Sequence, residues 1–148
     1  MLDETAGREP LRIEGYASLF GFADLNRDVV EAGAFQRALR LRGARGVRML
    51  FQHDAGEPVG VWDEIREDAK GLFVRGRVLA AGPRGKATAA LIREGAVDGL
   101  SIGFRTEQFT SRPSGGRYLK QIDLWEVSIV TFPMLPQARL RQAQLVSG

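Results

Sequence analysis

The sequence predicts a single, mainly β domain: an antiparallel sheet or barrel with two short helices. Three observations support this prediction. The chain has 148 residues, which suits one domain with one core. Short runs of alternating apolar residues recur along it between glycines and prolines, as in strands. Only two stretches have the spacing and end signals of helices. With 44% hydrophobic and 26% charged residues, the composition is that of an ordinary globular protein.

The first third of the chain predicts a strand, a helix and a second strand. Residues Leu11 to Phe20 alternate between apolar and polar, which is typical of a half-buried strand. Residues Ala34 to Arg40 form a short amphipathic segment that Gly43 ends as a helix C-cap. Val47 to Phe51 is strand-like and runs directly into His53, which we therefore place at the strand end or at the first loop position.

The middle of the chain predicts a hairpin. Pro58 to Trp62 and Gly71 to Leu79 have strand composition, and the polar residues 66–70 between them suit a turn. The clearest helix follows, from about Pro83 to Gly95, with a proline at its start and a glycine after its end.

The last third predicts two strands separated by a flexible loop. Gly99 to Phe104 and Leu124 to Phe132 alternate in strand fashion, and the glycine- and serine-rich residues 111–117 break the pattern between them. In the first of these strands Ser101 faces away from the apolar side chains, and Gly103 leaves its side uncrowded.

Composition excludes several kinds of site. The chain has no cysteine, which rules out disulfides, thiolate metal sites and a cysteine nucleophile. His53 is the single histidine, so no site can use two imidazoles. Asp24, Asn26 and Asp28 resemble the start of a calcium loop, but Val29 stands where glycine is expected, and we predict a turn. We therefore expect no metal and no cofactor.

The net charge by itself does not imply a nucleic-acid partner, and the apolar pattern does not indicate a membrane span. The net charge is only +3, and the chain has no apolar run of the roughly 20 residues that a membrane span needs. The first ten residues lack the apolar core of a signal peptide. We expect a cytoplasmic protein, or one enclosed in an assembly formed in the cytoplasm.

Three residues could together perform acyl transfer. A serine hydroxyl such as that of Ser101 becomes nucleophilic when a histidine removes its proton, and His53 is the only candidate base. Glu126, within an apolar strand, could orient the imidazole, with Asp54 and Asp123 as weaker candidates for that role. Each residue also has a plain structural interpretation: a surface histidine, a small strand serine and a solvent-facing glutamate.

Several short motifs follow one another in a fixed order between Leu11 and Ala138. They are Gly15-Tyr16-Ala17-Ser18-Leu19-Phe20, Gly33-Ala34-Phe35, Leu50-Phe51-Gln52-His53-Asp54 with Pro58-Val59-Gly60, Gly71-Leu72, Leu100-Ser101-Ile102-Gly103-Phe104, and Trp125-Glu126-Val127-Ser128-Ile129-Val130-Thr131. Each motif alone is short, but their ordered combination resembles the prohead maturation proteases of tailed bacteriophages with HK97-type capsids, which also occur in prophages and gene transfer agents.

The resemblance implies a serine endopeptidase related to the herpesvirus assembly proteases, with a closed antiparallel β-barrel and a few short surrounding helices. It assigns Ser101 as nucleophile and His53 as base. It points to Glu126 as third member, because the second histidine of the herpesvirus relatives is lacking here. It implies a flexible leader at residues 1–10, one protease domain at 11–138 and a short tail at 139–148.

The partners implied by the resemblance are the major capsid protein and its scaffolding region, cleaved inside the assembling procapsid. Cleavage of the protease itself and homo-oligomerisation are left open. The alternative is a non-enzymatic capsid-assembly or nucleic-acid-binding β domain, suggested by a group of arginines that equally suits a solvated helix face. These are Arg37, Arg40, Arg42, Arg45 and Arg48.

Overall fold

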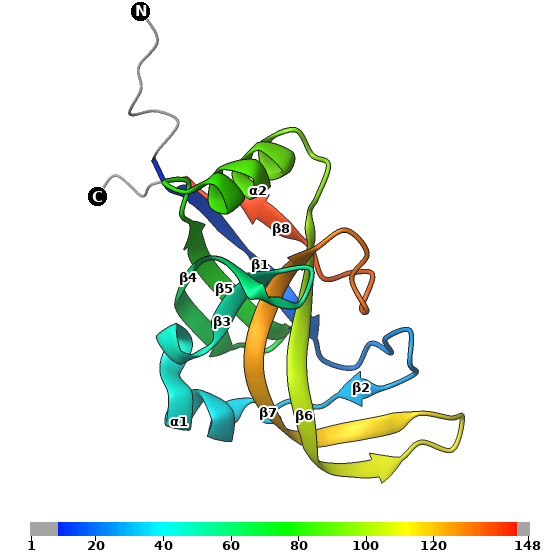
Figure 1. Cartoon of the computed structure of the whole chain (residues 1–148). Coiled ribbons are helices and arrows are strands. Elements are labelled where there is room, and N and C mark those ends of the chain that lie inside the picture. Colours follow the sequence, from blue (N-terminus) through cyan, green and yellow to red (C-terminus); the bar gives the residue numbers. More distant parts are fainter. Residues whose placement is uncertain (1–8, 145–148) are drawn as a thin grey trace, which may run out of the picture.

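The structure is a computed structural model that describes residues 9–144, so residues 1–8 of the expected leader and 145–148 of the expected tail lie outside the described part. Within that part, eight strands and two helices follow one another along the chain (Figure 1). Their bounds are β1 Leu11–Leu19, β2 Val29–Val30, α1 Gln36–Gly46, β3 Arg48–Phe51, β4 Asp54–Glu67, β5 Gly71–Val78, α2 Pro83–Arg93, β6 Gly99–Ser111, β7 Arg117–Val130 and β8 Leu140–Gln142.

All eight strands of the described chain belong to one sheet. The pairing order is β2-β7-β3-β4-β5-β1-β8, and β6 pairs with β7 along nearly its whole length. Since β6 occupies one edge of β7, the short strands β2 and β3 lie one after the other along its opposite edge. The strand β7 is therefore the structural centre of the half of the sheet that carries the predicted site residues.

The expected closed antiparallel β-barrel is wrong. The sheet is mixed, because β3 and β2 both pair with β7 in parallel. It is also not closed: between the first residues of β6 and the segment before β8, the described residues form an isolated bridge, Gly99 to Arg139, rather than a strand ladder. Hairpin spacing in a sequence indicates antiparallel neighbours only, whereas a parallel pair joins strands that are distant in the chain.

Most predicted elements are confirmed, with different lengths. The helix predicted from Pro83 and the strands predicted from Leu11 and Gly71 are present. The strands β4, β6 and β7 are much longer than predicted, and the loop predicted between β6 and β7 is a short turn. The short strands β2 and β8 were not predicted, and α1 extends past Gly43, which kinks it.

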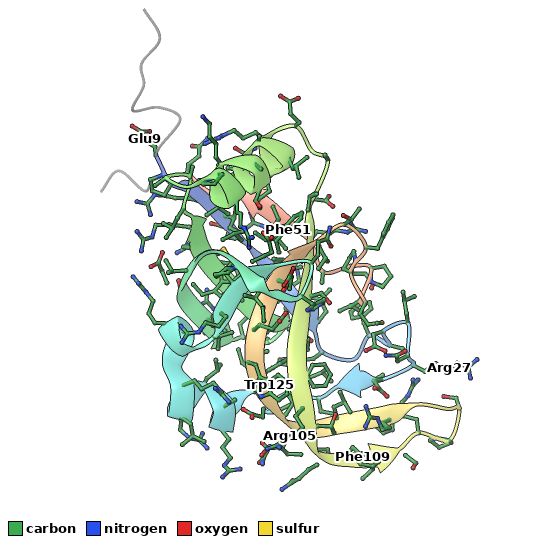
Figure 2. All side chains as sticks on the ribbon, viewed as in Figure 1. Glu9, Arg27, Phe51, Arg105, Phe109 and Trp125 are labelled. Carbon is green, nitrogen blue, oxygen red and sulfur yellow. The ribbon has the colours of Figure 1, made fainter. Side chains whose placement is uncertain are left out.

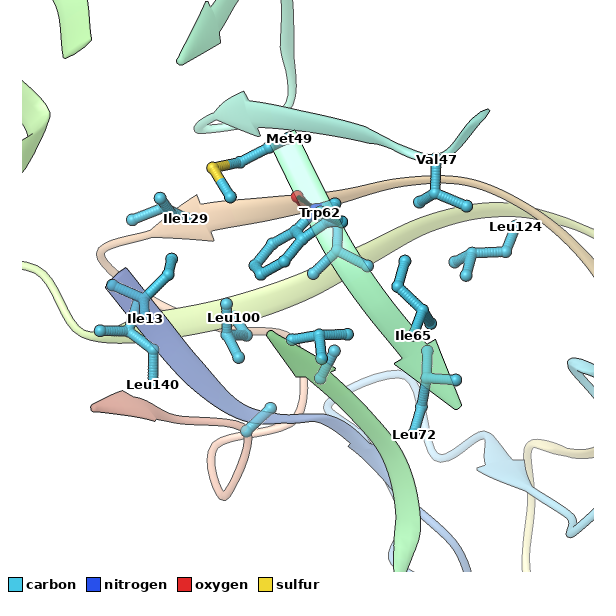
Figure 3. Packing of buried hydrophobic residues seen from close by; sticks show 14 of the residues in the cluster. Ile13, Val47, Met49, Trp62, Ile65, Leu72, Leu100, Leu124, Ile129 and Leu140 are labelled. Carbon is cyan, nitrogen blue, oxygen red and sulfur yellow. Dashed lines mark hydrogen bonds between the residues drawn. The ribbon is translucent and has the colours of Figure 1, made fainter. Parts of the chain in front are cut away.

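The core lies inside the curved sheet, with the indole of Trp62 near its middle (Figure 3). Trp62 is fully buried on β4, and its Nε1–H donates to the carbonyl oxygen of Val127 at 3.2 Å. This bond satisfies the one polar atom of a large apolar side chain. Because Val127 stands between Glu126 and Ser128, the core fixes the part of β7 that carries both.

The two helices cover different parts of the sheet (Figure 1). α1 packs against β4 and β7, whereas α2 packs against β4 and β5. In residues 9–144 neither helix has the length and apolar character needed to cross a membrane.

Candidate active site

Strand register brings four of the motif residues onto one face. In the antiparallel β6–β7 ladder Ser101 lies opposite Ser128, and Gly103 lies opposite Glu126. Residues directly opposite each other, and residues two apart on one strand, share a face. Ser101, Ser128 and Glu126 therefore form a compact polar group on the sheet.

Gly103 makes room for the carboxylate. A Cβ atom at this position would lie 2.6 Å from Cδ and 3.0 Å from Oε1 of Glu126. Any larger residue would displace the Glu126 side chain, so the glycine of the Ser-Ile-Gly motif has a direct steric role.

His53 lies in a tight turn between β3 and β4. Phe51 pairs with Asp54, which leaves Gln52 and His53 as the two turn residues, with φ values of 55° and 60°. Positive φ at both central positions is typical of the type I′ hairpin turn, where Asn-Gly is preferred. The histidine is thus at the second turn position and adopts a backbone conformation that costs energy for a residue with a side chain.

Contacts from the end of β7 and from Thr131, the residue after it, hold this turn in place. The backbone N–H of Gln52 donates to the carbonyl of Ile129 at 2.9 Å. The side-chain Nε2 of Gln52 donates to the Thr131 hydroxyl at 2.6 Å, and its Oε1 accepts the backbone N–H of Thr131 at 3.1 Å. The backbone N–H of His53 donates to Oγ of Ser128 at 3.1 Å. Figure 2 labels Phe51, the residue before this turn, and Trp125, the residue before Glu126.

Glu126 joins the histidine to Ser128. Its Oε1 lies 2.5 Å from Nδ1 of His53 and accepts a bond of 2.6 Å from Oγ of Ser128. The carboxylate side chain is 13% exposed and the imidazole 42%, so the pair lies at the boundary between protein and solvent. A carboxylate on Nδ1 fixes the ring and its tautomer, and leaves Nε2 to act on another group.

Ser101 and His53 line the same cavity, which has a volume of about 190 Å³. The hydroxyl of Ser101 belongs to a residue that is only 5% exposed. A buried hydroxyl and an accessible imidazole that share one cavity can act together on a molecule bound in that cavity.

The two weaker carboxylate candidates are engaged elsewhere. Asp54 Oδ1 accepts the backbone N–H of Gly56 at 2.9 Å. Asp123 binds the Trp125 indole N–H at 2.9 Å and the guanidinium of Arg42, and these bonds hold the pKa of Asp123 below its usual value. Of the three acids considered, Glu126 is the one that contacts His53.

The segment from Asp24 to Asp28 is the predicted turn. Asp24 Oδ1 accepts the backbone N–H groups of Asn26 and Asp28 at 2.8 and 3.0 Å, and Asp28 forms an ion pair of 2.8 Å with Arg117. Burial raises the pKa of Asp24. Within residues 9–144, no group of three or more His, Cys, Asp or Glu residues is arranged to hold a metal ion.

Acidic side chains neutralise much of the arginine cluster. Arg37 pairs with Glu107 at 3.4 Å, Arg42 with Asp123 at 3.0 Å, and Arg45 with Asp63 at 2.9 Å. These arginines therefore form an ion-paired helix surface, which weakens the nucleic-acid alternative.

Ser128 is the site residue that sequence reasoning missed. It is fully buried and bonds both the carboxylate of Glu126 and the backbone of His53. Its position two residues after Glu126, on the same strand face, is the signal that could have identified it.

The chain matches a known protein family over nearly its whole length. Residues 2–147 match the family model described as caudovirus prohead serine protease. The prohead protease of Enterobacteria phage HK97 is 42% identical over 140 residues, which cover 91% of this chain and 61% of that protein. The chain thus spans about 61% of the length of this relative.

Two solved structures have a similar fold. The capsid assembly protease of bacteriophage T4 has a TM-score of 0.62 and 20% identity, with 82% of each chain covered. A KSHV protease, solved with a hexapeptide phosphonate inhibitor, also has a TM-score of 0.62, at 14% identity over 93% of this chain and 66% of that one. At identities this low the comparison shows a likeness of fold alone: the sheet of this chain is similar to that of the KSHV protease.

Proposed function

This chain belongs to the caudovirus prohead serine protease family, and we propose that it is a serine endopeptidase in which Ser101, His53 and Glu126 form the catalytic triad. One observation carries the assignment: the only histidine of the chain has its Nδ1 2.5 Å from a partly buried carboxylate and lines a cavity together with Ser101. This is the set of partners that activates a serine.

The three groups have distinct roles in the reaction. His53 accepts the proton of Ser101 through Nε2 as Oγ attacks the carbonyl carbon of the substrate. Glu126 stabilises the resulting imidazolium and keeps Nδ1 protonated. His53 then gives the proton to the leaving amine as the peptide C–N bond breaks, which leaves the acyl group on Ser101. The same imidazole takes a proton from the water molecule that attacks the acyl-enzyme and returns it to Ser101 Oγ as the acid product leaves.

The family membership supports a capsid protein as substrate. We propose that the enzyme cleaves the scaffolding region of the major capsid protein within the assembling procapsid. The match to a prohead protease over 91% of this chain supports this role.

A fluorophosphonate probe tests the activity directly, because it reacts with serines that a neighbouring base activates. We expect covalent labelling at Ser101 that disappears in Ser101→Ala and in His53→Asn. Co-expression with the major capsid protein of the same phage, followed by mass spectrometry, should show loss of its scaffolding region in the wild type only. A folded wild-type protein that neither reacts with the probe nor processes capsid protein would disprove the proposal, and salt-sensitive DNA binding without labelling would favour the alternative.

A further inference from the structure

We propose that the cavity beside Ser101 binds a large, uncharged apolar side chain of the substrate close to the scissile bond, an inference that rests on the proposed protease function. The cavity thereby determines which peptide segments the enzyme cleaves.

The size of the cavity fits one large side chain. Its volume is about 190 Å³, whereas an apolar protein cavity of about 150 Å³ already holds a benzene molecule. Ser101 stands between Leu100 and Ile102 in its wall. A substrate side chain in this cavity therefore lies beside Ser101, close to the bond that the serine attacks.

Much of the cavity wall is apolar. β6 contributes Ile102 and Phe104, the loop after β1 contributes Phe22, and the loop after β7 contributes Met134 and Leu135. A backbone bond of 3.0 Å from the Leu25 N–H to the Met134 carbonyl joins the two loops. Each loop thus restrains the other at the mouth of the cavity.

The charged residues of the cavity are already matched within the chain. Asp28 accepts three bonds, of 2.8 to 3.2 Å, from the backbone and guanidinium of Arg117. Asp24 accepts the backbone N–H groups of Asn26 and Asp28 at 2.8 and 3.0 Å. A charged substrate side chain would lose its hydration here without gaining an unpaired partner. An apolar one meets no such cost.

The mouth of the cavity exposes apolar side chains. Phe22 is 50% exposed and Met134 is 42% exposed, and the nearby loop residues Leu25 and Phe132 are also exposed. Exposed apolar residues grouped at a cavity are typical of binding sites. Substrate binding would remove their surface from water.

Cleavage of an internally quenched peptide library, randomised at each position around the scissile bond, tests the preference. We expect one position where Leu, Ile, Met or Phe raises kcat/KM about 10- to 100-fold over Lys or Asp, the range that burial of a large apolar side chain provides.

A charge placed in the wall should change this preference. In Met134→Asp we expect the ratio of kcat/KM for Leu over Lys peptides to fall at least about tenfold, because the new carboxylate disfavours apolar and favours cationic side chains. Leu79→Asp is the matched control: Leu79 is 43% exposed, as Met134 is 42% exposed, but lies outside this cavity. Its ratio should stay at the wild-type value.

The outcomes separate the cavity from the triad. Probe labelling of wild-type Ser101 without an apolar preference at any position would overturn the cavity assignment and leave the triad intact. An equal change of ratio in Leu79→Asp would do the same. Absence of both labelling and peptide cleavage in the folded wild type would overturn both proposals.

Discussion

The strand β4 begins and ends at turns of two different kinds. The turn at its end, residues 68–70, is held by its own side chain: Asp68 Oδ1 accepts the backbone N–H groups of Lys70 and Gly71 at 2.8 and 3.1 Å. The turn at its beginning, Gln52-His53, has positive φ at both residues and is held by Ile129, Thr131 and Ser128 of the distant segment around the end of β7.

The difference shows what placing a histidine costs. A turn that only reverses the chain uses residues that suit it locally, as the aspartate does at residue 68. The first turn has Gln52-His53 where Asn-Gly is favoured, so its backbone geometry depends on contacts from another strand. We therefore expect substitutions around the first turn to affect catalysis, and substitutions in the second to affect stability alone.

The largest effect should follow replacement of His53 by asparagine. Asparagine tolerates positive φ, so His53→Asn should keep the turn while removing the base. We expect the rate of peptide hydrolysis to fall on the order of 10⁴-fold or more, with the melting temperature close to that of the wild type.

Ser101→Ala is the companion variant for this comparison. Because base and nucleophile act as one unit, the double variant should be no slower than either single variant. Additive losses would mean that His53 serves another purpose than activating Ser101.

Removing the charge of Glu126 should have the second largest effect. Glu126→Gln keeps the size of the side chain but cannot stabilise an imidazolium, and its amide favours the wrong tautomer of His53. Hydrolysis should slow by roughly 10²- to 10⁴-fold at an unchanged fold by circular dichroism. A wild-type rate would show that the site works as a Ser–His pair.

Loss of the Ser128 hydroxyl should have a smaller effect on the rate. Ser128→Ala leaves the backbone N–H of His53 without its acceptor and frees the Glu126 carboxylate, so we expect a loss of roughly 10- to 100-fold. Stability should fall by about 0.5–1.5 kcal/mol, the net contribution of a typical hydrogen bond, because His53 is exposed and water can solvate its N–H. The pH profile of kcat/KM should shift as well, since Ser128 bonds the carboxylate that faces the imidazole. A stability loss with an unchanged rate and pH profile would limit Ser128 to a structural role.

The helices and strands that local sequence patterns predicted correctly are those that interactions within short segments determine. The helix from Pro83, the first strand and the hairpin of β4 and β5 depend on spacing, end signals and turn residues within short segments. The residues chosen as a candidate site, Ser101, His53 and Glu126, were found from residue chemistry and motif resemblance. Their catalytic roles stay predictions.

The rest depends on pairing between distant segments. Nothing in the local pattern indicates that β3 pairs with β7 in parallel, and this pairing places Leu50 opposite Ser128 and the following turn above Glu126. The same pairing makes the sheet mixed. The role of Ser128 likewise depends on register. Its spacing of two from Glu126 predicts a shared strand face, but the β3–β7 pairing is what brings the backbone of His53 to its hydroxyl.

The smallest effect on activity should come from the second turn. The hydroxyl of Tyr16 donates to Asp68, and this bond holds the pKa of Asp68 below its usual value. In acid the unfolded chain therefore binds a proton at Asp68 before the folded chain does, so stability rises with pH in that range. The contribution is complete above the unfolded pKa of about 4 and is lost as the pH falls through the lower folded value.

Asp68→Asn should keep wild-type hydrolysis at neutral pH, since the turn lies outside the cavity of Ser101 and His53. Its urea midpoint should fall less steeply than that of the wild type between about pH 5 and pH 3, and Tyr16→Phe should flatten the same limb by removing the donor. A fall in hydrolysis comparable to that of Ser128→Ala would contradict the division of the two turns into one that serves catalysis and one that serves the fold.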